Sequence, residues 1–173
     1  MLKKSKKINI NASNVYNNIL LLSRNKLFYT NFSLADTFEN RIHLIFIHTS
    51  FLFIKIKQND QNKKYKIFHQ EIFDITFNKI ELNMREIGYG DVTVNKNMKK
   101  LVKNFYNILL NCENFKKKQL NEKNIFFTKF LDNNENIKMA NNLALINYFE
   151  KYQAFCFDLS HDSVLKGEIN FKS

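Results

Sequence analysis

Hydrophobic side chains recur every three or four residues along most of the chain, a spacing that predicts amphipathic α-helices. The clearest stripes lie on residues 38–56 and 73–87, where the stripe positions follow one another at alternating spacings of four and three. The remaining segments show the same period less regularly. We predict six helices, on residues 13–26, 33–57 (beginning at Ser33 or Asp36), 65–87, 91–115, 121–131 and 135–155. We expect Asp91, Thr93 or Asn95 to cap the fourth of these helices.

The second predicted helix is apolar on nearly every side, because Leu44, Phe46, Phe51 and Phe53 lie outside its stripe. A helix of this kind belongs at the centre of a bundle. Its most apolar run, residues 44–56, is 13 residues long, whereas a bilayer-spanning helix needs about 20. We therefore interpret it as a core helix and not as a membrane anchor.

The composition supports a helical fold and excludes several others. The chain has 173 residues, the length of one domain, with three glycines and no proline. So few turn-forming residues argue against an all-β sandwich or barrel, and against a glycine-rich phosphate loop. We predict an all-α, single-domain bundle of about six helices. A basic N-terminal tail (1–12) precedes the helical domain (13–157), and a short irregular C-terminal tail (158–173) follows it.

The chain is strongly basic, with a formal net charge of +11. Such a charge is typical of proteins that bind nucleic acid, the ribosome or anionic lipid. The abundance of Lys, Asn, Ile and Phe is also typical of an AT-rich genome, so the charge has a second explanation. The lysines at 96, 99, 100 and 103 crowd the first turns of the fourth predicted helix, where positive charge opposes the helix dipole. An anionic partner or the composition bias must explain them.

No pattern in the sequence indicates an enzyme, a metal site or a cofactor. His43 and His48 are five residues apart and do not share a helix face as an i, i+4 pair does. Cys112 and Cys156 are distant and form no CxxC motif. We found no pair of carboxylates that could act as general acid and base. Residues 1–11 are basic but lack the apolar core of a signal peptide, so we expect a cytoplasmic protein.

The rare residue types are more informative than the abundant ones. Gly88 directly follows the third predicted helix, where a glycine in the left-handed conformation would end it. Arg41 lies five residues after Asp36, and Arg85 lies six residues before Asp91. Because the chain has only three arginines, Arg24, Arg41 and Arg85, and otherwise uses lysine, we expect Arg41 and Arg85 to bind carboxylates or helix-end carbonyls through their planar guanidinium groups. The alternative is that they are exposed arginines whose pairing contributes about 0–1 kcal/mol.

Three blocks of sequence resemble one known family. The first contains Phe28-Tyr29, Ala-Asp-Thr-Phe-Glu-Asn-Arg at 35–41, and His48; the second contains Met-Arg-Glu-Ile-Gly-Tyr-Gly-Asp at 84–91, Val-Asn-Lys at 94–96 and Phe105-Tyr106; the third is Leu-Lys-Gly-Glu-Ile-Asn-Phe at 165–171. In this order they resemble the ubiquinol–cytochrome c chaperone family. The chain departs from the family at Asn107 and Ile108, where Gly and often Arg are usual.

The resemblance implies a non-catalytic assembly factor with no cofactor. Mitochondrial members of this family bind newly made cytochrome b near the ribosome exit and promote its assembly into the cytochrome bc complex (complex III), so the resemblance implies the same role for this protein. The short N-terminus suits a bacterial, alphaproteobacterial-type member that contacts the inner-membrane surface, acting as a monomer or with a second assembly factor. A basic helical module that binds nucleic acid or the ribosome is the alternative.

We expect partner binding to involve the family blocks and the nearby lysines. Aromatic side chains on the surface would suit a nascent apolar segment, and positive charge would suit ribosomal RNA or lipid headgroups. The aromatic residues could instead belong to the core. The candidate residues are Phe28, Tyr29, Asp36, Arg41, Arg85, Glu86, Gly88, Tyr89, Gly90, Asp91, Lys96, Lys100 and Tyr106.

Overall fold

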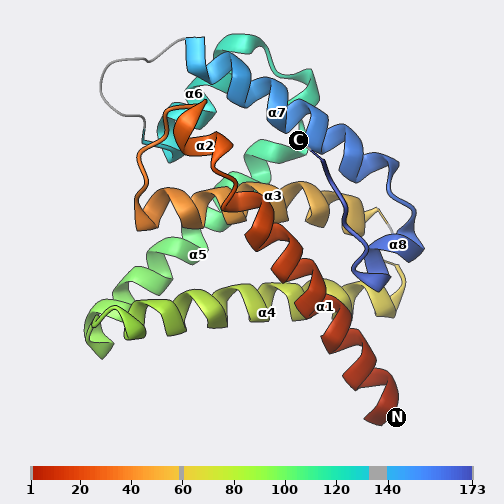
Figure 1. The fold of residues 1–173 in the computed structure, drawn as a ribbon. Helices are drawn as coiled ribbons and strands as arrows, with labels where there is room; N and C mark the ends of the chain where they lie inside the picture. The colour runs from red at the N-terminus through yellow and green to blue at the C-terminus, as the bar shows by residue number, and fades with distance from the viewer. Residues whose placement is uncertain (1, 59–60, 133–139, 173) are drawn as a thin grey trace.

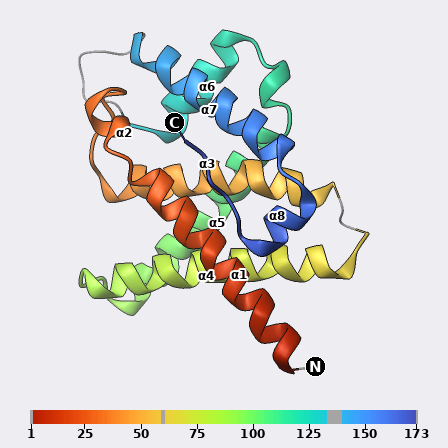
Figure 2. The ribbon, with the colours of Figure 1, turned by 45° about the vertical axis from the view of Figure 1, so that its right-hand side comes forward.

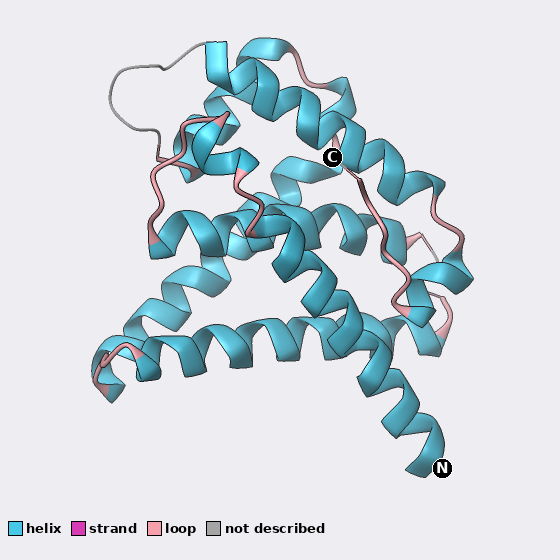
Figure 3. Cartoon of the chain, in the orientation of Figure 1, coloured by secondary structure: helices cyan, strands magenta, loops and turns pink. Residues whose placement is uncertain are grey.

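The computed structural model describes residues 2–58, 61–132 and 140–172, which form helices joined by loops (Figures 1 and 3). Six of the helices have eleven or more residues, which confirms the predicted all-α bundle. In chain order the described elements are α1 (Leu2–Ser23), α2 (Leu27–Thr30), α3 (Phe38–Lys57), α4 (Lys63–Glu86), α5 (Asp91–Glu113), the 3-10 helix η1 (Phe115–Lys117), α6 (Leu120–Phe130), α7 (Ala140–Asp158) and α8 (His161–Lys166). Within this part of the chain, no helix has the length and apolarity to cross a membrane.

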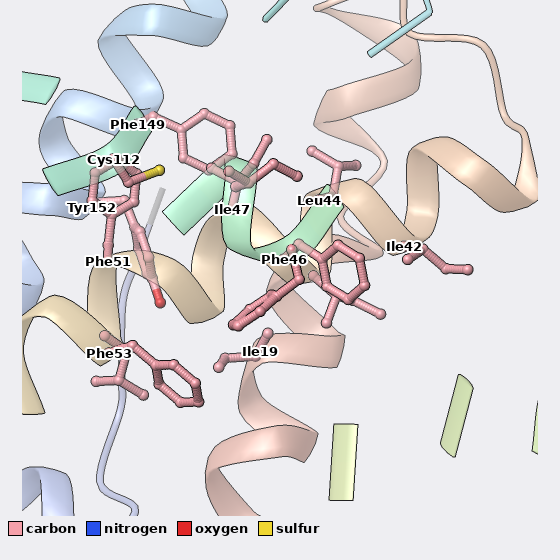
Figure 4. Close-up of a cluster of buried hydrophobic side chains, with 14 of the residues drawn as sticks. Ile19, Ile42, Leu44, Phe46, Ile47, Phe51, Phe53, Cys112, Phe149 and Tyr152 are labelled. Atoms are coloured by element: carbon pink, nitrogen blue, oxygen red, sulfur yellow. The ribbon is translucent and has the colours of Figure 1, made fainter. Parts of the chain in front are cut away.

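Helix α3 runs through the centre of the bundle, as its all-round apolar sequence predicted. Helices α1, α4, α5 and α7 pack around it (Figures 1 and 2). Every residue from 42 to 53 is buried. In Figure 4, Phe46, Phe51 and Phe53 of α3 lie in one core with Phe149 and Tyr152 of α7.

The turn between α4 and α5 is set by Gly88. Its φ of 95° is in the left-handed region, which a side chain disfavours. The amide of Gly88 donates to the carbonyl of Arg85 at 3.0 Å, and the amide of Tyr89 donates to the carbonyl of Met84 at 3.1 Å. These two bonds form a Schellman motif, which confirms the predicted helix end.

An N-cap and one buried polar side chain fix the start of α3. Thr37 is the N-cap, and its hydroxyl accepts a hydrogen bond from the amide of Asn40. The Asn40 side chain is 1% exposed and donates to the carbonyls of Ala35 (2.7 Å) and Asp132 (2.9 Å), while its oxygen accepts from the amide of Asp132. The α2–α3 connection is thereby tied to the end of α6.

Both ends of the chain are more helical than the sequence predicted. The first helix begins at Leu2 and not at Ser13, and Ala12 of the added part is buried in the core. The predicted C-terminal tail contains α8, which Ser160 caps and Gly167 ends with a φ of 77°. Other helix starts were also misplaced. Helix α3 begins after Thr37 and not at Ser33 or Asp36, and the start predicted at residue 135 lies outside the described residues.

Candidate partner-binding site

Two neighbouring clefts open where α1, α3, α4 and the start of α5 come together. Phe38 and Ile42, on the first turns of α3, line both clefts. We call them the arginine cleft, of about 200 Å³, between α1, α3 and α4, and the lysine cleft, of about 280 Å³, between α3, the α4–α5 turn and α5. The start of α3, which Asn40 holds in place, is therefore the wall that the two clefts share.

The arginine cleft combines an apolar floor with a charged rim. The buried side chains of Ile45 and Ile80 form its floor, and the exposed side chains of Arg24, Arg41 and Glu86 form its rim. Among the described residues, no carboxylate lies within ion-pair distance of Arg24. This guanidinium is therefore free to bind a carboxylate or a main-chain carbonyl of a partner.

Arg41 is held in the rim by a bidentate ion pair with Asp36. Its Nε and Nη2 atoms donate to the two carboxylate oxygens at 2.7 and 2.8 Å, as we expected from the sequence. This hydrogen bonding lowers the pKa of Asp36 below its usual value. Tyr29 lies beside the pair, and its pKa is raised by burial and then by the Asp36 carboxylate. The pair fixes the direction in which Arg41 faces the cleft, although both partners are about half exposed.

The lysine cleft has a mixed lining of aromatic, apolar and charged groups. Tyr89 of the α4–α5 turn lines it with 44% of its surface exposed. Lys100 of α5 also lines this cleft and donates to Glu39 at 3.2 Å. The buried side chains of Met84 and Leu101 supply apolar surface to the same cleft. Tyr89 therefore offers an aromatic contact above an apolar floor.

Arg85 braces the turn that presents Tyr89. Its guanidinium donates to Glu81 at 2.9 Å and also to Asp91, the first residue of α5. These contacts raise the pKa of Arg85, with Asp91 as the larger cause. We had expected Asp91, Thr93 or Asn95 to cap α5. The N-cap is Gly90, without a side-chain bond, so that prediction was wrong.

The structure brings together only some of the predicted site residues. Arg41 and Glu86 line the arginine cleft, and Tyr89 and Lys100 line the lysine cleft. Asp36 pairs with Arg41, and Arg85 pairs with Asp91 beside Tyr89. Gly88 and Gly90 form the turn that contains Tyr89.

Three predicted residues lie elsewhere. Phe28 has no exposed surface and packs edge-on against Tyr148, with ring centroids 5.0 Å apart, so it belongs to the core and does not offer a partner contact. Lys96 and Tyr106 are exposed on α5 but line neither cleft. Tyr106 lies beside Phe73 of α4, with centroids 6.1 Å apart.

The buried histidine of the first sequence block has a structural role. Nδ1 of His48 donates a hydrogen bond to the carbonyl of Leu44 at 2.7 Å. Its Nε2 therefore accepts a hydrogen bond from the hydroxyl of Tyr148 at 2.9 Å. Burial lowers the pKa of His48 to about 4, which keeps the ring neutral. The described residues contain no group of three or more His, Cys, Asp or Glu side chains that could hold a metal ion.

The sequence analysis did not place Arg24, Tyr16 or Phe38 in the site, although all three line the arginine cleft. A signal existed for Arg24, because it is one of only three arginines in the chain. Tyr16 carries no such signal, because aromatic residues at helical spacing are typical of a core. Phe38 lies in the first sequence block, but its place in the apolar stripe of its helix also predicts a core residue. Their position follows from the way α1 crosses α3 and α4 (Figure 1).

Comparison with known proteins identifies the family. The model of the family described as "Ubiquinol-cytochrome C chaperone" matches residues 30–171. The chain belongs to this family. The match includes the lysine cleft and the α3 and α4 walls of the arginine cleft, whereas Arg24 lies before it. Membership of the ubiquinol–cytochrome c chaperone family indicates a protein that acts by binding a protein partner.

A solved structure supports the same fold. The chain is similar to "Crystal structure of the Cbp3 homolog from Brucella abortus", with a TM-score of 0.84 and 24% sequence identity. The similarity covers 99% of this chain and 93% of that chain, so the fold is shared from end to end. The search of curated proteins found no match.

Proposed function

We propose that this protein binds newly synthesised cytochrome b in the cytoplasm and promotes its assembly into the cytochrome bc complex (complex III), without catalysing a reaction. The observation that carries the proposal is the family match, which extends over residues 30–171. We assign the client to the two clefts. They unite Arg41, Glu86 and Tyr89 of the sequence blocks with the nearby Lys100 on one end of the bundle.

The chemistry of the clefts suits parts of a membrane protein that has not yet inserted. Such a client exposes apolar side chains that water disfavours, and the floors of both clefts offer apolar surface to cover them. With volumes of about 200 and 280 Å³, the clefts admit individual side chains and not a whole helix. Arg24, Arg41 and Tyr89 are of the residue types that contribute most to protein interfaces.

Co-isolation during synthesis tests the proposal. Cytochrome b is made in a translation reaction that contains membrane vesicles and the tagged full-length protein, and the tag is then recovered. We expect cytochrome b in the recovered fraction, and not another multi-spanning membrane protein of similar length made in parallel. Equal recovery of the two membrane proteins would contradict a specific role for cytochrome b.

A cleft variant tests where the client binds. Arg24→Gln combined with Arg41→Gln should lower the recovery of cytochrome b at least about tenfold, since two charged contacts are lost. Lys117→Gln combined with Lys151→Gln removes the same charge from exposed positions outside both clefts and should leave recovery unchanged. If the two double variants behave alike, the assignment of the client to the arginine cleft is wrong.

The net charge of +11 favours a second candidate, a module that binds ribosomal RNA or other nucleic acid. Phosphate contacts make affinity fall steeply with salt. Tight, salt-sensitive binding to naked RNA, together with failure to recover cytochrome b, would support this second function over the first.

A further inference from the structure

The outward side of α5 carries a regular pattern that neither cleft uses. Exposed side chains follow one another there at spacings of four and three, which places them on one side of the helix. The opposite side is buried in the core through Val94, Leu101 and Phe105. We call this stripe the α5 face, and it consists of Val92, Lys96, Lys99, Lys103, Tyr106 and Leu110.

The charge of the α5 face is positive and unbalanced. Residues 92–112 contain four lysines and no Asp or Glu. Of these lysines, Lys100 forms an ion pair with Glu39 at the lysine cleft. The three lysines of the α5 face have no ion pair among the described residues. Folding therefore gains nothing from this arrangement, but an anionic surface would.

Hydrophobic groups lie at both ends of the α5 face. Val92 is 84% exposed at one end, Leu110 is 62% exposed at the other, and Tyr106 is 51% exposed next to it. The rise of a helix separates Val92 and Leu110 by about 27 Å. Lysines in the middle and apolar side chains at the ends match a helix that lies flat in a membrane interface.

We propose that the α5 face docks on the surface of a bilayer that contains anionic phospholipids. The lysines would lie among the phosphate headgroups, Val92 and Leu110 would reach the acyl chains, and Tyr106 would lie at the interface, where tyrosine is enriched. Nucleic acid fits the face less well. It contains no arginine, the residue suited to bidentate phosphate binding, and only one aromatic on which a base could stack.

This docking goes beyond the proposed function and adds a location to it. Lys99 and Lys103 of the α5 face flank Lys100, which lines the lysine cleft. A protein held by the α5 face would therefore keep the lysine cleft beside the bilayer, where a membrane protein is inserted. The docking itself needs no client, so it can be tested with purified protein and lipid alone.

Vesicle flotation of the full chain tests the proposal. One set of vesicles is an equal mixture of phosphatidylglycerol and phosphatidylcholine, and the other is phosphatidylcholine alone. We expect binding to the first set and little to the second. Lys96→Gln, Lys99→Gln and Lys103→Gln together should weaken binding about 100-fold, since each lysine near an anionic surface contributes about a factor of five.

A matched variant separates the α5 face from net charge. Lys116→Gln, Lys117→Gln and Lys151→Gln remove the same charge from exposed positions elsewhere, and should weaken binding about threefold or less because of screening. Val92→Ser with Leu110→Ser keeps every charge and should weaken binding about tenfold, since exposed aliphatic groups can no longer enter the acyl layer. All substituted positions are exposed, so the melting temperature should not change.

Three outcomes would overturn the proposal. One is the absence of binding to the anionic vesicles. Another is an equal loss of vesicle binding in the two triple-lysine variants, which would show that binding depends on net charge and not on the α5 face. The third is a loss of binding to labelled single-stranded RNA in the Lys96, Lys99 and Lys103 variant while its vesicle binding is retained, which would make nucleic acid the occupant.

Discussion

The side-chain amide of Asn11 donates a hydrogen bond of 2.8 Å to the carbonyl of Leu165, across 154 positions of sequence. A second bond runs beside it, from the amide of Asn18 to the carbonyl of Gly167 at 3.1 Å. Helix α1 is thereby joined to the end of α8 (Figure 2). Since α1 forms one wall of the arginine cleft, the C-terminal segment supports the candidate site from a distance.

Gly167→Ala should break this junction. The φ of Gly167 is 77°, and a Cβ atom there would lie 2.8 Å from the carbonyl oxygen of Asn11. Left-handed strain and the clash together should lower the free energy of unfolding by at least about 2 kcal/mol. Chemical denaturation measures the loss, and hydrogen exchange should show faster exchange in residues 161–171. An unchanged exchange rate there would contradict the role of the junction.

Gly88→Ala and Gly90→Ala form a matched pair in the α4–α5 turn. Neither added Cβ would meet another atom within 4 Å, but Gly88 has a φ of 95°, whereas Gly90 has a φ of −70°. Gly88→Ala should therefore cost about 1 kcal/mol, and Gly90→Ala should change stability by less than about 0.5 kcal/mol. Thermal unfolding of the two variants measures the difference. Equal costs would refute the left-handed strain argument.

Asn40→Ala should be among the more destabilising single substitutions. It removes three part-buried hydrogen bonds, to the carbonyls of Ala35 and Asp132 and from the amide of Asp132, and leaves that amide without this partner. We expect a loss of about 3 kcal/mol in the free energy of unfolding. Asn78→Ala, at an exposed position of α4, serves as the control and should stay within about 0.5 kcal/mol. Urea denaturation measures the free energy of unfolding of both variants. A similar loss in the two would contradict the role of the Asn40 hydrogen bonds.

Stability should fall as the pH is lowered below 6.5. His48 is fully buried with a pKa of about 4, whereas its unfolded ring binds a proton near pH 6.5. The free energy of unfolding is therefore unaffected by the titration of His48 above pH 6.5 and falls as the pH is lowered towards 4. The loss is about 2 kcal/mol at pH 5. Burial also lowers the pKa values of His43 and His69, which adds a change of the same sign.

Comparison with His48→Gln isolates the part that belongs to His48. The variant loses the titrating ring, so its free energy of unfolding should vary less between pH 7 and pH 5, although its stability at pH 7 is lower because the packing against Tyr148 changes. Denaturation curves at several pH values supply both numbers. Parallel pH profiles of the two proteins would show that His48 is not the buried titrating group.

Local features were predictable because they depend on short stretches of chain. The period of the stripes located α3, α4, α5 and α6, and Gly88 marked a helix end, since both signals arise within one or two helical turns. The Asp36–Arg41 and Arg85–Asp91 pairs were also expected, because each joins residues five or six positions apart. The family was predictable because three short sequence blocks follow one another in the order that is typical of it.

The position of each block in space was not predictable in the same way. Phe28, expected at the surface, is buried because α2 folds back onto α7, and Arg24 reaches the cleft because α1 crosses α3 and α4. The Asn40–Asp132 contact joins residues 92 positions apart. The period of a stripe tells which side of a helix is buried but not which neighbour covers it.

The sequence by itself determined the helices, their main breaks, the excess of positive charge and the family. Only the tertiary structure decided that Arg24, Arg41, Tyr89 and Lys100 share one end of the bundle, while Lys96 and Tyr106 lie on another face. The reason is physical. Helix formation depends on hydrogen bonds four residues apart, whereas the clefts depend on how apolar faces distant in sequence pack together.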